Sequence, residues 1–153
     1  ARGILNRRVE IATEAFGADT APTLSCIEDL AGFESRCGQH VASLHLYQGL
    51  LRKLPRNHEQ VPTILSHVVS SYMALNRLDD AEKAARDAIK LTGDQTQGDF
   101  VALAHHNLGQ VLELKQQFQA SDDAFETAQG AAQSQAVLSI VRESRRQRAA
   151  PEL

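Results

Sequence analysis

Residues 102–128, ALAHHNLGQVLELKQQFQASDDAFETA, decide the fold of this chain. Apolar residues recur every three or four positions on both sides of a short polar turn, which is the spacing of one helical face. Gly109 lies among the apolar residues of the first segment, where a side chain would hold a second helix away. Ser121 and Phe125 then follow at helical spacing on the second segment. The stretch therefore predicts two amphipathic helices that form a tight hairpin.

The same hairpin pattern occurs twice more upstream. Segments 24–54, 62–90 and 102–129 superpose on one another with steps of about 40 residues. The superposed positions are the turns Gly38, Asn76 and Gln116, the small residues Ser43, Ala81 and Ser121, and then Tyr47, Ala85 and Phe125. Two antiparallel helices approach closely only where small residues meet, and a neighbouring aromatic ring fills the remaining volume. The chain is therefore predicted to be a stack of helical hairpins.

Further helices are expected on both sides of the three hairpins. Residues 3–15 carry an apolar stripe that ends at Gly17, and residues 131–147 carry a last stripe before an arginine-rich end. Apolar residues never alternate over any length, so no strand is expected. The prediction is an all-α chain that forms a single domain over residues 1–153.

This arrangement is the tetratricopeptide (TPR) pattern, and the resemblance is strongest in Asn107-Leu108-Gly109 with Phe118, Ser121, Phe125 and Ala128. The repeats exceed the usual length of about 34 residues and in this respect resemble the longer repeats of kinesin light chains. The resemblance implies a right-handed α-solenoid of three TPR-like hairpins. Segment 3–15 would then be the second half of a repeat, and segment 131–147 a capping helix.

The net charge and the hydrophobic pattern of the whole sequence argue against several classes of protein. The net charge of −3 does not favour nucleic acid. There is no apolar run long enough to cross a bilayer, and no signal peptide is visible, so no membrane insertion is expected. The chain begins with Ala1 rather than Met, which fits a processed form, a fragment or part of something longer.

Two cysteines indicate the compartment. Cys26 and Cys37 fall on one predicted helix, three turns apart, too far for an internal disulfide. We expect free thiols in a reducing intracellular compartment, cytoplasmic or mitochondrial, with a redox or metal pair as the alternative.

No catalytic, cofactor or metal site is predicted. His105 and His106 are adjacent and point to different helix faces, so they cannot hold one ion together. Gly93 and Gly98 lack the spacing of a phosphate-binding loop and no strand precedes them. We therefore expect no enzyme.

The first helix of each TPR hairpin lines the concave face of the stack, which usually holds a peptide or helix. The residues predicted to face this groove are Glu28, Gly32, Ser35, Arg36, Ser66, Ser70, Met73, His106, Asn107, Gln110 and Glu113. Chaperone-binding TPR domains place lysines where this chain has Glu28, Ser66 and His106, which argues against a carboxylate clamp. Asn107 resembles the groove asparagines of kinesin light chains, and Asp29 and His67 occupy the equivalent places.

A short basic patch follows at Arg142, Arg145, Arg146 and Arg148. It fits either the solvated end of the stack or a contact with an acidic partner. Residues 137–143 and the arginines after them are also similar to the end of the mitochondrial TPR protein associated with respiratory complex III.

Two functions fit this architecture. The first is a non-catalytic scaffold or adaptor that binds a peptide or helix of a partner protein in the groove. The second is a structural or assembly subunit of a large, multi-subunit complex, with a mitochondrial complex as one case.

Overall fold

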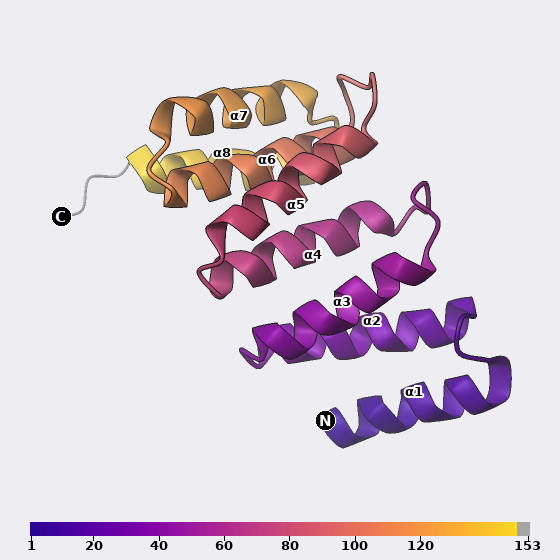
Figure 1. The fold of residues 1–153 in the computed structure, drawn as a ribbon. Coiled ribbons are helices and arrows are strands. Elements are labelled where there is room, and N and C mark those ends of the chain that lie inside the picture. Colours follow the sequence, from indigo (N-terminus) through magenta and orange to yellow (C-terminus); the bar gives the residue numbers. More distant parts are fainter. Residues whose placement is uncertain (150–153) are drawn as a thin grey trace. The chain divides into compact units, whose positions relative to one another are not determined.

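The computed structural model describes residues 1–149, and all regular structure within them is helical. The helices are α1 (Arg2–Phe16), α2 (Ala21–Arg36), α3 (His40–Lys53), α4 (Val61–Ala74), α5 (Leu78–Leu91), α6 (Asp99–Leu114), α7 (Phe118–Ala131) and α8 (Gln135–Ala149). These bounds confirm the predicted all-α class and the predicted succession of helices (Figure 1). In the part of the chain that is described, no helix has the length and apolar character needed to cross a membrane.

The chain divides into two compact units, and each is described by itself. Unit 1 comprises Ala1–Asn76 with α1 to α4, and unit 2 begins at Arg77 and contains α5 to α8. The boundary falls at the turn of the predicted middle repeat, 62–90. The single domain over residues 1–153 stays a prediction.

In unit 1, each helix packs against the next one along the chain: α1 on α2, α2 on α3, and α3 on α4. Tyr47 and Leu50 of α3 are each only 1% exposed and lie at the centre of this packing. Arg2 links α1 to α2. Its guanidinium donates two hydrogen bonds, of 2.7 and 2.6 Å, to the buried carboxylate of Glu34 on α2. Such bidentate geometry is the strong form of an arginine–carboxylate pair.

In unit 2, α6 is the central helix and packs against α5, α7 and α8. Between α6 and α7, Gly109 faces the ring of Phe125. The end of α7 and the start of α8 are held to α6 by Asp99, whose carboxylate accepts hydrogen bonds from the backbone N–H groups of Gln133 and Ser134. These bonds lower the pKa of Asp99 because they stabilise its charged form.

The three predicted hairpin turns share one backbone conformation. Gly38, Asn76 and Gln116 have φ angles of 76°, 55° and 61°, all in the left-handed region. Asn76 and Gln116 are the only non-glycine residues with positive φ in the described chain. The turn positions that superpose in the sequence therefore share a left-handed φ.

The predicted start of the last helix is wrong by four residues. Ala131 still belongs to α7, Ala132 is extended, and α8 begins at Gln135. Ser134 caps α8, because its hydroxyl accepts a hydrogen bond from the backbone N–H of Val137. Asp99 binds the N–H groups of residues 133 and 134 in the connection before the helix.

Candidate functional site

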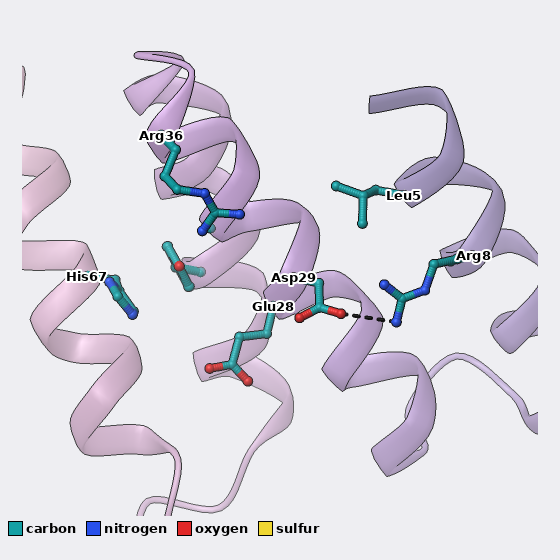
Figure 2. A pocket seen from close by; sticks show the side chains of 8 residues that line it. Leu5, Arg8, Glu28, Asp29, Arg36 and His67 are labelled. Carbon is teal, nitrogen blue, oxygen red and sulfur yellow. Dashed lines mark ion pairs between the residues drawn. The ribbon is translucent and has the colours of Figure 1, made fainter. Parts of the chain in front are cut away.

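A pocket of about 480 Å³ lies within unit 1, and we call it the α2 pocket. All four helices of unit 1 contribute to it. Its lining residues are Leu5, Arg8, Glu28, Asp29, Gly32, Arg36, Tyr47 and His67. Figure 2 shows charged side chains of α1 and α2 together with His67 of α4 around the opening.

One face of α2 forms the floor of the α2 pocket. Glu28, Gly32 and Arg36 follow each other at steps of four, so they lie on one side of the helix. A Cβ atom at Gly32 would lie 3.3 Å from Nη1 of Arg36 and 3.6 Å from the hydroxyl oxygen of Tyr47. The glycine thus leaves open the space on which a guanidinium and a phenol converge.

Two stacked rings form a wall of the α2 pocket. The rings of Tyr47 and His67 are nearly parallel, with centroids 5.0 Å apart and an interplanar angle of 11°. Burial raises the pKa of Tyr47, and the charge of Glu28 raises it further. Burial lowers the pKa of His67, and Glu28 opposes that effect. Both groups are therefore held in their uncharged forms near neutral pH.

The charges around the α2 pocket are not all paired. Arg8 forms an ion pair of 3.1 Å with Asp29, drawn as a dashed line in Figure 2. Glu28 accepts a hydrogen bond of 3.1 Å from the side-chain amide of Gln60, which is neutral. Among the described residues, no ion pair reaches Glu28, and neither an ion pair nor a hydrogen bond reaches the side chain of Arg36. One carboxylate and one guanidinium therefore keep uncompensated charge.

Three of the predicted groove residues, Glu28, Gly32 and Arg36, line the α2 pocket. The other four predicted in unit 1 do not: Ser35 on α2, and Ser66, Ser70 and Met73 on α4. The hydroxyl of Ser70 donates to the backbone carbonyl of Ser66 within α4. The predicted groove residues of unit 1 that line the α2 pocket are thus all on α2.

The predicted groove residues of unit 2 lie on α6. His106 and Asn107 are buried, with only 4% and 7% of their surface exposed, whereas Gln110 and Glu113 are half-buried. The ring of His106 packs against Phe125 with a centroid distance of 5.6 Å, and burial lowers the pKa of His106. A partner would therefore meet little of His106 and Asn107 in this conformation. Their role in binding stays a prediction.

The basic patch lies on α8. Arg142, Arg145 and Arg146 are exposed, and Arg145 donates a hydrogen bond of 3.0 Å to the side-chain oxygen of Gln129. The side chain of Arg148, the fourth predicted member, lies outside the described residues. Contact of this patch with an acidic partner stays a prediction.

Five lining residues were not among the predicted site residues: Leu5, Arg8, Asp29, Tyr47 and His67. A sequence signal existed for two of them, because Asp29 and His67 occupy the repeat position of Asn107. Arg8 and Leu5 enter the site through the packing of α1 on α2, which no local pattern reveals.

Cys26 and Cys37 are both free thiols. Cys26 lies on α2, but Cys37 is the residue directly after its end, so the prediction that both lie on one helix is wrong by one residue. No group of three or more His, Cys, Asp or Glu side chains placed to hold a metal ion occurs in the described residues.

No protein-family model matches the chain, and no curated protein matches it. Solved structures do match. A protein of Podosopora anserina, described as a kinesin light chain with nearly identical TPR-like repeats, superposes with a TM-score of 0.71 at 15% identity over 85% of this chain. BtubC (BKLC) from P. vanneervenii superposes with a TM-score of 0.68 at 20% identity, again over 85% of this chain.

The matched region is 64% of the first structure and 55% of the second, so the chain spans less than two thirds of each. None of these matches concerns the mitochondrial complex III protein, and that resemblance has no support beyond the sequence. At such identities the similarity shows the fold. The chain has the fold of the TPR-like repeats of kinesin light chains.

Proposed function

We propose that this chain is a non-catalytic scaffold that binds a peptide or helical segment of a partner protein at the α2 pocket. The observation that carries the proposal is the pair of uncompensated charges, Arg36 and Glu28, on either side of Gly32. Preformed concave sites with few well-placed polar groups are typical of ligand binding. A peptide is a suitable occupant because it brings both side-chain charges and backbone hydrogen-bonding groups.

The fold supports this class of function. Stacked helical hairpins present extended surfaces that bind other proteins, and the similar solved structures consist of such repeats. The α2 pocket includes Asp29 and His67, which stand at the repeat position of a kinesin light chain groove asparagine. These two positions therefore lie in the pocket, but neither keeps the asparagine of the resemblance.

A second candidate function, a subunit built into a larger assembly, has its own support. Ile4 and Ile11 lie two turns apart on α1 and are 69% and 50% exposed. Phe16 at the end of the same helix is 61% exposed. Large apolar side chains gathered on one helix are characteristic of a surface that packs against another protein.

The test is affinity capture of partners from the source cell with matched variants. Gly32→Leu fills the α2 pocket, and Gly130→Leu is its control, because Gly130 is also helical and a Cβ there meets nothing within 4 Å. The scaffold proposal expects one set of partners to be lost with Gly32→Leu and kept with Gly130→Leu. Partners that survive Gly32→Leu but are lost with Ile4→Glu/Ile11→Glu would favour the built-in subunit instead.

A further inference from the structure

We infer that the α2 pocket recognises an extended peptide carrying one acidic and one basic side chain, the acid bound at Arg36 and the base at Glu28. This inference rests on the proposed peptide-binding function and adds the chemistry of the ligand. It starts from the separation of the two uncompensated charges on α2.

The acidic side chain of the peptide is assigned to the Arg36 end. Nη1 of Arg36 and the hydroxyl of Tyr47 both point at the space that Gly32 leaves open. A guanidinium and a hydroxyl supply several hydrogen-bond donors. An ionised carboxylate only accepts hydrogen bonds, so a carboxylate of the peptide complements the donors of Arg36 and Tyr47. Among the described residues, no carboxylate of this chain forms an ion pair with Arg36.

The basic side chain of the peptide is assigned to the Glu28 end. Glu28 has one recorded partner, the neutral amide of Gln60, and an ionised carboxylate accepts up to about four hydrogen bonds. The nearby rings of Tyr47 and His67 are stacked and uncharged at neutral pH, so they do not repel a cation. Arg8 is already neutralised by Asp29.

The order of the two charges follows from the helix. Glu28 and Arg36 lie on one face of α2 with Gly32 between them, and the guanidinium of Arg36 reaches back toward Gly32, with Nη1 3.3 Å from its Cβ position. A peptide that runs along this face therefore meets the two charges one after the other. Figure 2 shows Arg36 and Glu28 at opposite ends of the drawn face of α2, with His67 facing them from α4.

The experiment is selection of random displayed peptides on the intact chain, followed by sequencing of the bound pools. Wild type should enrich an acid and a base in one fixed order along the peptide. The charge-swapped variant Arg36→Glu/Glu28→Arg should enrich the same pair in the reverse order along the peptide. Arg56→Glu changes an exposed charge outside the α2 pocket and should leave the wild-type preference unchanged.

Uncharged single variants keep the test valid if the charge-swapped variant Arg36→Glu/Glu28→Arg does not fold. With Arg36→Gln the preference for the acid should disappear and that for the base remain, and with Glu28→Gln the converse should hold. A synthetic peptide from the wild-type pool should bind each single variant about fivefold more weakly, the scale of one partly exposed ion pair.

The outcomes separate the two proposals. Peptides that depend on an open Gly32 but show no paired charges, or show the same charge order on the swapped variant, would overturn this inference and leave the proposed function standing. Peptides whose recovery is unaffected by Gly32→Leu would overturn both.

Discussion

A Cβ atom on Gly109 would lie 2.8 Å from both Cδ1 and Cε1 of Phe125, closer than Cβ atoms approach other heavy atoms in proteins. Phe125 is fully buried, so its ring cannot move aside into solvent. The two residues lie on α6 and α7, and their contact sets how closely those helices approach.

Replacing Gly109 by Ala should therefore destabilise unit 2 despite the better helix propensity of alanine. Overpacking of this kind costs about 1 to 3 kcal/mol of unfolding free energy. Urea denaturation followed by circular dichroism measures the change. Gly130→Ala is the control and should raise stability by about 0.5 to 1 kcal/mol, because nothing lies within 4 Å of a Cβ there. Equal effects of the two substitutions would show that the glycine is not needed for packing.

Ser121 and Ser43 occupy the same repeat position but differ in hydrogen bonding. The buried hydroxyl of Ser121 donates to the carbonyl of Gly109 at 2.9 Å, whereas the buried hydroxyl of Ser43 has no partner among the described residues. Ser121→Ala should cost about 1 kcal/mol, and Ser43→Ala should be neutral or stabilising. The comparison needs only the two unfolding curves. A larger loss for Ser43→Ala would contradict the described contacts.

The turn at Gln116 carries backbone strain that glycine would relieve. Its φ angle is 61°, a conformation that costs a residue with a Cβ about 1 to 2 kcal/mol. Gln116→Gly should raise the melting temperature of the chain, and Gly38→Gln, at a φ of 76°, should lower it. Calorimetry measures the melting temperatures of both variants. Shifts of the same sign in Gln116→Gly and Gly38→Gln would exclude backbone strain at φ > 0 as the cause.

Lys115 joins α6 to α5 and makes the stability of unit 2 depend on acid. Its ammonium group lies 2.7 Å from Asp79 and 2.6 Å from Glu82. The hydrogen bond from Lys115 is the largest cause that lowers the pKa of both carboxyl groups below their ordinary values of 3.8 and 4.5.

Because both pKa values are depressed in the folded chain, the stabilisation is complete above about pH 5 and is lost as the pH falls through the folded values. Lys115→Met should therefore flatten the loss of stability between about pH 5 and pH 3, measured by thermal unfolding at a series of pH values. An unchanged pH profile in the variant would place the acid sensitivity elsewhere, for example at Asp99.

His67 should titrate below 6.5 in the folded chain, because burial disfavours its charged form. Glu28 raises that pKa, so Glu28→Gln should lower it further. Proton NMR of the imidazole ring gives both values. A higher pKa of His67 in the Glu28→Gln variant would mean that the carboxylate of Glu28 does not face His67.

The α6–α7 hairpin was predictable from sequence because its determinants are local. Gly109, Ser121 and Phe125 reveal the helix crossing by composition and spacing alone, and the turn at Gln116 lies where the apolar period is interrupted. The start of α8 had a local signal in its N-cap residue Ser134, whereas the hold of Asp99 on residues 133 and 134 comes from a distant position in the chain.

The site was predictable only in part, because a local pattern shows which residues share a helix face but not which other helices pack against it. Glu28, Gly32 and Arg36 lie on one face of one helix, so the repeat register places them together. Arg8 and Tyr47 join them only through the packing of α1 and α3 on α2. The burial of His106 depends on neighbours that cover α6 from more than one side, which a helical period does not encode.

The most direct test of the account is a map of amide chemical shifts on the isotope-labelled chain as a peptide selected on it is added. We expect the largest chemical-shift changes of the wild-type chain at Gly32, Arg36 and His67. In the Gly32→Leu variant, the same peptide should cause no changes at Arg36 and His67. Changes confined to α6, around His106 and Gln110, or to the exposed face of α1 would contradict the claim that the α2 pocket is the binding site.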